Sequence, residues 1–262
     1  MSLGKRVTSL SMALFAFACV AIGWEIIVRY GGFPPKLVPG LGVVWEAFFR
    51  LATNGVLLAA TRATLVRLVS GFVIAALIGV PLGIFMGRHP WVEDTLLPVV
   101  TFFYPIPGLA YAPLFVLWFG LGDVPTILLV GFSSCLAVTL NSWKGVKTVK
   151  PIWIRSAQVM GASDRTLFWR VILPGALPYI LIGLRLGVAN AWRILIAIEM
   201  IMSVERGLGW MIFGAQTFLN TDVMLATIAV IGAIGMLIEN QIFQRVERRT
   251  ILRWGMVGER NA

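Results

Sequence analysis

Three charged side chains interrupt an apolar run in the C-terminal half of the chain. Arg185, Arg193 and Glu199 all lie between Tyr179 and Ser203, a segment long enough to cross a bilayer as a helix. A basic residue near the centre of such a helix costs about 2.5–3.5 kcal/mol on insertion scales, so it should face protein or water. Arg193 and Glu199 lie on nearly opposite helix faces, so they cannot pair with each other.

Arg193 lies close to the middle of this run, and two interpretations of it stay open. In one, Arg193 lines a pathway through the membrane and favours anions. In the other, Arg193 is a structural residue that donates to backbone carbonyls. The glycines at positions 207, 209 and 214 predict a flexible mouth beyond the end of the run.

A second unusual segment, residues 145–178, has its own local pattern. It predicts a short helix over Ile152–Met160, a turn at Gly161-Ala162-Ser163, and a second amphipathic stretch that ends near residue 173. Gly161 suits a turn that a side chain would obstruct, and Ser163 is a good N-cap for the second stretch. The prolines at 174 and 178 are expected to end this unit before the next apolar run.

The composition places these residues in a membrane protein. Hydrophobic residues make up 58% of the chain, charged residues only 13%, and the mean hydropathy is +0.87. A soluble domain carries about a quarter charged residues. The net charge is +10, but the basic residues gather at the ends of apolar runs, as membrane topology requires, and no nucleic-acid role is expected. Two cysteines within apolar runs and a single histidine predict no metal site.

The apolar runs predict an all-α polytopic membrane protein with six transmembrane helices. The first run, with no clear cleavage site after it, is expected to be a retained helix rather than a signal peptide. Most of the 22 Lys and Arg residues fall inside if both termini are cytoplasmic, which also puts residues 145–178 in the cytoplasm. The predicted spans are Ser9–Val28, Leu68–Gly87, a segment within Thr95–Gly122, Val124–Trp143, Tyr179–Ser203 and Val223–Phe243.

The third of these segments contains four prolines, at positions 98, 105, 107 and 113. Proline removes a backbone donor and kinks a helix, and in lipid the freed carbonyls need protein or water. We therefore predict a broken helix that lines a cavity; a merely bent packing helix is the alternative. Residues 31–67, with an amphipathic stretch over Val43–Leu51, are expected at the membrane surface.

The segment around Gly161 resembles the coupling loop of binding-protein-dependent ABC importer permeases. In that family Glu-Ala-Ala is followed after three residues by Gly and, after nine more, by Ile-x-Leu-Pro. Here Arg155, Ser156 and Ala157 stand at the first three positions, and Gly161 follows at the family spacing. The closing positions are Val171, Leu173 and Pro174. Arg155 departs from the pattern because it replaces an acid, and Ser156 replaces an alanine.

Other stretches are similar to the nitrate, sulfonate, taurine and bicarbonate branch of this family. They are Tyr104-Pro105-Ile106-Pro107, Ala112-Pro113-Leu114, Phe119 to Asp123, Gly183-Leu184-Arg185, Glu199-Met200, Gly207-Leu208-Gly209 and Glu247 to Trp254.

The resemblance implies a type I ABC importer transmembrane fold and a role for two groups of residues. The group expected to couple to an ATPase is Arg155, Ser156, Ala157, Met160, Gly161, Ala162, Ser163, Leu173 and Pro174. The group expected along a substrate pathway is Arg193, Glu199, Tyr104, Pro105 and Pro107, with Glu199 in a structural or gating role. We expect residues 1–60 to form the first helix and a periplasmic surface segment, residues 61–250 the transmembrane domain, and residues 251–262 a cytoplasmic tail.

The resemblance also implies partners and a location. We expect an ATPase dimer, a second permease copy, a periplasmic binding protein and surrounding lipid, in a bacterial inner membrane. No phosphate-binding Gly-x-x-x-x-Gly-Lys-Ser/Thr sequence occurs in the chain, so we expect no cofactor and no enzyme activity here; ATP and Mg should bind to the ATPase. The cargo is expected to be a small anion such as nitrate, bicarbonate, a sulfonate or taurine.

Two other classes of protein fit the sequence less well. A self-sufficient channel or secondary transporter would need its own coupling residues or inverted repeats, and it leaves the Gly161 loop unexplained. A membrane-embedded enzyme would need converging His, Asp or Cys groups, which a chain with one histidine does not offer.

Overall fold

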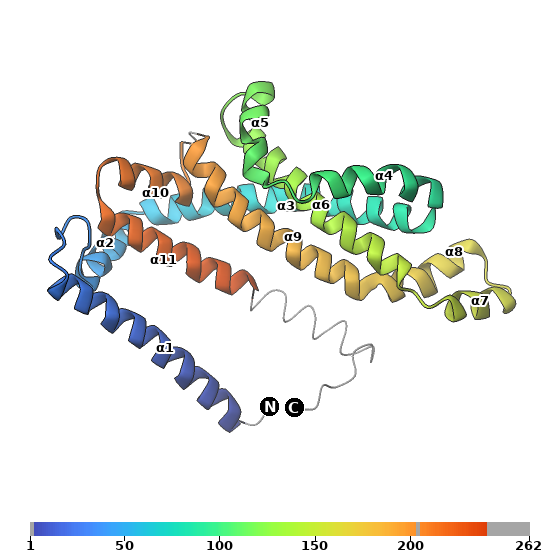
Figure 1. Ribbon diagram of the computed structural model, residues 1–262, viewed down its shortest axis with the longest axis horizontal. Helices are drawn as coiled ribbons and strands as arrows, with labels where there is room; N and C mark the ends of the chain where they lie inside the picture. The colour runs from blue at the N-terminus through green and yellow to red at the C-terminus, as the bar shows by residue number, and fades with distance from the viewer. Residues whose placement is uncertain (1–2, 203–204, 240–262) are drawn as a thin grey trace.

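A computed structural model describes residues 3–202 and 205–239, and within them every regular element is helical. Figure 1 shows an elongated bundle in which α3, α6 and α9 run side by side, while α1 lies apart from them. The principal helices are α1 (Leu3–Tyr30), α2 (Leu41–Thr53), α3 (Val56–Arg88), α4 (Pro90–Phe103), α5 (Ala112–Phe119), α6 (Asp123–Lys147), α7 (Pro151–Val159), α8 (Asp164–Leu167), α9 (Leu173–Ile201), α10 (Leu208–Thr217) and α11 (Thr221–Leu237). A short 3-10 helix, η1 (Gly108–Tyr111), precedes α5, and a π-helical turn, η2 (Phe168–Ile172), joins α8 to α9.

The centre of the bundle is α6, which packs against both α3 and α9. Small residues make the α3 contact close. Gly71, Gly79, Gly83 and Gly87 fall on one face of α3 at multiples of four residues. A Cβ built on Gly83 would lie 2.4 Å from the Thr139 carbonyl oxygen, so the α6 backbone occupies that space. Such small-residue faces let helices in a membrane approach closely and gain dispersion contacts.

Three helical stretches of the described chain are long and apolar enough to cross a membrane: Val56–Arg88, Asp123–Lys147 and Asp164–Ile201. A bent pair, α4 with η1 and α5, brings the number to four if the pair counts as one span. The α11 helix is apolar but shorter. The expected six crossings and the side on which each terminus lies therefore stay predictions. The end of the fifth predicted span, the end of the sixth and the tail 251–262 lie outside the described residues.

One predicted helix start was wrong. The second apolar helix begins at Val56 rather than Leu68, so residues 56–67 are part of this helix, and the position of the boundary predicted at residues 60/61 falls within α3. The prediction stopped at Arg67 because it is charged, but its side chain is buried and paired. The amphipathic stretch 43–51 does form a helix, α2, whose first turn donates a hydrogen bond to α1: the Leu41 N–H donates to Glu25 Oε1 at 2.7 Å.

The break expected in the proline-rich segment is confirmed. Helices Pro90–Phe103 and Gly108–Phe119 meet at 93°, with Tyr104-Pro105-Ile106-Pro107 between them. Pro105 and Pro107 cannot donate backbone hydrogen bonds, which prevents one straight helix from continuing through this point. Figure 1 shows α5 turned away from the axis of α4.

The turn predicted at Gly161 and the helix cap predicted at Ser163 are confirmed, but the helix end predicted at the prolines is not. Gly161 adopts φ +78° after α7, and Ser163 caps α8 by accepting from the Thr166 N–H at 3.3 Å. The prolines do not end the unit, however, because one helical stretch runs on from Asp164 to Ile201. The π-helical turn lies directly before Pro174, and this wider turn accommodates a residue without an N–H donor.

Candidate functional site

An ion cluster joins three helices at the end of the bundle opposite α7. Arg67 of α3 donates through Nη1 to Glu199 Oε1 of α9 at 2.7 Å. Its Nε donates to Asp123 Oδ1, at the start of α6, also at 2.7 Å. Arg67 is 6% exposed in its side chain and Glu199 is fully buried, whereas Asp123 is 64% exposed. The buried pair needs further bonds to offset the loss of hydration.

Those further bonds come from α3 and the start of α10. Thr64 Oγ1 donates to Glu199 Oε2 at 2.9 Å and accepts from the Leu208 N–H at 2.9 Å. The Gly209 N–H donates to Glu199 Oε2 at 3.0 Å. A Cβ on Gly207 would lie 2.6 Å from that carboxylate and one on Gly209 would lie 2.4 Å from a backbone oxygen. Of the three glycines predicted to make a flexible mouth, Gly207 and Gly209 are therefore required for close packing around the carboxylate, whereas a Cβ on Gly214 would meet nothing within 4 Å.

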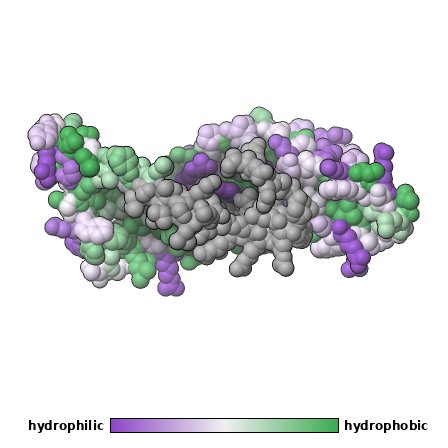
Figure 2. Space-filling model, turned by 90° about the horizontal axis from the view of Figure 1, so that it is seen from below, coloured by the Kyte–Doolittle hydropathy of each residue, from purple (hydrophilic) through white to green (hydrophobic). Residues whose placement is uncertain are grey.

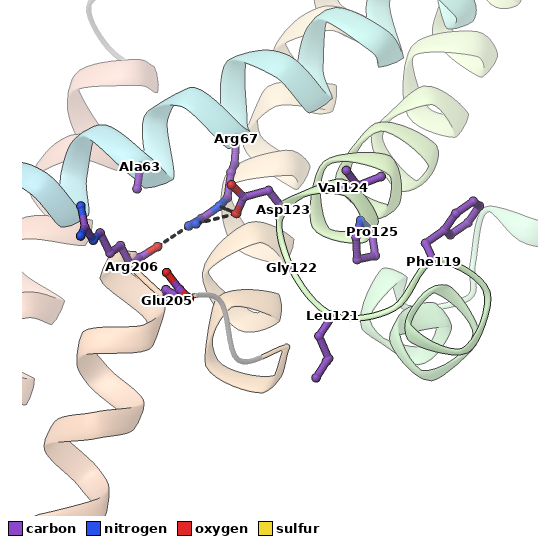
Figure 3. Close-up of a pocket in the computed structure, with 10 residues that line it drawn as sticks. All are labelled: Ala63, Arg67, Phe119, Leu121, Gly122, Asp123, Val124, Pro125, Glu205 and Arg206. Carbon is purple, nitrogen blue, oxygen red and sulfur yellow. Dashed lines mark hydrogen bonds and ion pairs between the residues drawn. The ribbon is translucent and has the colours of Figure 1, made fainter.

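A cavity of about 770 Å³ opens beside this cluster (Figure 3). Arg67 and Asp123 approach each other on one side of the cavity, and Arg67 Nη1 donates a hydrogen bond to the Arg206 carbonyl oxygen at 2.5 Å. Glu205 lies near this group at the edge of the cavity. Charges of both signs line the space, so its walls favour neither anions nor cations. Glu199 thus belongs to this buried ion cluster, and its structural or gating role stays a prediction.

A different cavity lies under the break between α4 and η1. Its volume is about 320 Å³, and it brings Tyr104, Pro105 and Pro107 together with Arg193 of α9. These four residues were predicted from sequence to share a pathway, and the structure places them around one space. Glu199, the fifth, is not among the lining residues. None of the described residues that line the cavity is Asp or Glu, so Arg193 supplies its charge.

Two polar residues of this cavity were not found from the sequence. Ser133 of α6 is 7% exposed, and its Oγ has no hydrogen-bond partner among the described residues. Asn190 of α9 donates through Nδ2 to the Ser133 carbonyl at 3.2 Å. A lone serine or asparagine in an apolar run gives no signal of its own, and only the folded contact between α6 and α9 brings them to Arg193.

Arg193 itself is exposed and donates through Nε to the Ala189 carbonyl of its own helix at 3.1 Å. This bond fits the structural interpretation of Arg193, while its position at the cavity fits the pathway interpretation. The second arginine of α9, Arg185, pairs with Glu239, and its Nε donates to Glu239 Oε1 at 2.8 Å. Arg185 is thus part of a contact between α9 and the residues that follow α11.

The predicted coupling residues lie together at one end of the molecule, in and after α7. Arg155, Ser156, Met160, Gly161 and Ser163 are exposed. Ala157 and Leu173 instead pack toward the apolar cluster that ties α7 to η2 and α9. Ala162 lies in the turn, where its N–H donates to the Ala157 carbonyl at 3.0 Å, and Pro174 lies in the first turn of α9.

Comparison with known proteins decides the family. Residues 79–251 match the family described as the binding-protein-dependent transport system inner membrane component. The chain belongs to this family. It is therefore an ABC transporter permease, as the resemblance from sequence indicated.

Curated relatives agree with this assignment over nearly the whole chain. The taurine transport system permease protein TauC of Escherichia coli is 38% identical over 96% of this chain and 91% of its own length. The putative aliphatic sulfonates transport permease protein SsuC of Bacillus subtilis is 31% identical over 95% of this chain and 89% of its own length. The bicarbonate transport system permease protein CmpB of Synechocystis is 30% identical over 70% of this chain and 65% of its own length.

A solved structure supports the fold. A chain of the MetNI methionine ABC transporter, in an inward-facing conformation, aligns with a TM-score of 0.65 at 19% identity. The alignment covers 74% of the permease described here and 96% of the MetNI chain. At this identity the likeness concerns the fold alone.

Proposed function

We propose that this permease forms the translocation pathway of an ATP-driven importer for a small anion of the sulfonate, taurine, bicarbonate or nitrate type. The observation that carries the choice of cargo is the cavity below the Tyr104–Pro107 break. It holds one cationic side chain, Arg193, and no described Asp or Glu. Sulfonate and carboxylate groups accept the charge-assisted hydrogen bonds that a guanidinium donates. The taurine, sulfonate and bicarbonate systems of the relatives point to the same class of cargo.

The remaining parts of the proposal follow from the family. The chain crosses a bacterial inner membrane six times with both termini in the cytoplasm, and it pairs with a second copy of itself. An ATPase dimer binds ATP and Mg and docks at α7, and a periplasmic binding protein delivers the cargo. The apolar helices and the exposed α7–Gly161 turn at one end of the bundle support this arrangement.

Uptake by reconstituted complexes tests the cargo. Proteoliposomes would contain the permease, its ATPase and its binding protein, with radiolabelled taurine, bicarbonate or nitrate as the candidate substrate. Arg193→Gln removes the charge and keeps a donor, and we expect it to lower anion uptake by about tenfold, the effect of losing one charge-assisted contact. Arg62→Gln, an exposed arginine on α3 away from the cavity, is the matched control.

The outcome separates the two interpretations of Arg193. If Arg193→Gln transports at the wild-type rate, Arg193 is only a structural residue on its own helix and the pathway assignment fails. If wild-type uptake persists when the ATPase is omitted, the chain is a self-sufficient transporter, and the proposed importer is wrong.

A further inference from the structure

The α7 helix presents a charge pattern that the proposed function does not explain. From Lys144 to Ser163 the sequence contains no Asp or Glu. Lys147 is neutralised by an ion pair with Glu93, and Lys150 lies over the Trp153 ring at 5.5 Å. Arg155 points outward from the middle of α7 and forms no ion pair within the described part of the chain.

An apolar tip lies next to this positive charge. Val159 is 88% exposed and Met160 is 86% exposed, and both directly precede the Gly161 turn. Figure 2 shows hydrophobic side chains beside hydrophilic ones at this end of the molecule. Apolar side chains that are bare at the end of a short helix, rimmed by charge, are typical of a surface that a partner covers.

The place of α7 favours a protein partner over lipid headgroups. The α7 and α8 helices lie beyond the ends of α6 and α9, at the tip of the long axis (Figure 1). The apolar helices α3, α6 and α9 end before this tip, so a bilayer around them leaves α7 in water. A charged and apolar helix held clear of the membrane suits insertion into a cleft.

We propose that the ATPase subunit that docks on α7 carries a carboxylate facing Arg155, in an otherwise apolar cleft that receives Val159 and Met160. This inference rests on the proposed coupling to an ATPase. A carboxylate in the cleft would attract Arg155 and would repel an acidic side chain at the same position, so the charge of this residue sets which ATPase the permease accepts.

A charge reversal tests the contact in the assembled complex. The permease would be co-expressed with the ATPase subunit from the same gene cluster and purified through a tag on the permease. We expect Arg155→Glu to lower ATPase recovery and ATP-dependent uptake by about tenfold or more at low salt, and Arg155→Lys to keep both near the wild-type level. Arg62→Glu makes the same charge change at the far end of α3 and should leave recovery unchanged.

A second substitution makes the test specific. Each Asp or Glu in the ATPase cleft would be changed to Lys and combined with Arg155→Glu. We expect one such pair to restore recovery, which a merely misfolded α7 would not allow. The proposal is overturned if Arg155→Glu binds the ATPase as the wild type does, or if it loses only binding to phosphatidylglycerol vesicles. If the wild-type permease recovers no ATPase at all, the proposed function has failed instead.

Discussion

Arg67 and Glu199 form a buried ion pair between α3 and α9, with 2.7 Å between Nη1 and Oε1. The two residues lie 132 positions apart in the sequence. The pair also reaches the start of α6 through Asp123 and the start of α10 through the Gly209 N–H. The pair therefore links four helices, α3, α6, α9 and α10, at the end of the bundle opposite α7.

Breaking this pair should destabilise the fold strongly. Removing one partner leaves the other charge buried and uncompensated, at a cost of about 3–5 kcal/mol. We expect Glu199→Met and Arg67→Met each to lower the thermal midpoint of the detergent-purified permease and its folded yield. The double variant should be less destabilised than the sum of the two single variants, because it leaves no lone charge beside Thr64.

Arg62→Met is the control for these variants, since Arg62 is an exposed arginine that precedes Arg67 by five residues on the same helix. It should unfold at the wild-type temperature. Additive effects in the double variant would contradict the coupling between Arg67 and Glu199.

The α3–α6 contact gives a second prediction. Gly83→Ala places a Cβ 2.4 Å from the Thr139 carbonyl oxygen and 2.9 Å from the Trp143 amide nitrogen, and backbone atoms of α6 cannot move aside alone. We expect a loss of about 1–3 kcal/mol, the usual cost of overpacking, measured by thermal or denaturant unfolding in detergent. Gly42→Ala, where a Cβ meets nothing within 4 Å, should be neutral or slightly stabilising. An equal response of both variants would show that α3 and α6 are not packed this closely.

Gly161 gives a third prediction, which concerns the partner rather than the fold. Its φ of +78° lies in the left-handed region, and a Cβ there would meet nothing within 4 Å in this chain. We expect Gly161→Asp to keep the folded yield, because Asp tolerates this conformation, and to reduce both ATPase co-purification and uptake. Gly161→Asn separates the effect of charge from that of bulk.

Gly55→Asp is the matched control. Gly55 precedes the first residue of α3, has φ +76° and, like Gly161, has nothing within 4 Å of a built Cβ. It should leave ATPase co-purification unchanged. If Gly161→Asp also co-purifies and transports normally, the coupling loop has been placed on the wrong segment.

The sequence predicted features whose causes are local. The turn at Gly161, the Ser163 cap and the break at Pro105 and Pro107 follow from the residues themselves, since a left-handed turn, a side-chain acceptor and missing donors act within a few positions. The prediction failed at Pro174, which was expected to end a helix. The π-helical turn before it lets one helical stretch continue from Asp164 to Ile201.

The candidate sites were predicted only in part, because they depend on contacts between distant segments. Arg67 was interpreted as the end of a surface segment, since nothing near it in the sequence shows that Glu199 will neutralise it. Ser133 and Asn190 gave no signal for the same reason. Arg193, Tyr104 and the two prolines line one cavity, whereas Glu199, which the sequence had grouped with them, does not; a role of this group in a pathway stays a prediction.

Ser133 gives the last prediction, which distinguishes a substrate contact from a packing defect. Its Oγ is buried without a partner among the described residues, and so is that of the neighbouring Ser134, but only Ser133 lines the cavity with Arg193. An unpaired buried hydroxyl costs about 1–3 kcal/mol, so Ser133→Ala and Ser134→Ala should each unfold at or above the wild-type temperature. We expect uptake to fall only in Ser133→Ala. Of the two serines only Ser133 lines the cavity, so only its hydroxyl can donate a hydrogen bond to a passing anion. Equal uptake by the two variants would remove Ser133 from the pathway, whereas a loss in both would point to a disturbance of α6 as a whole.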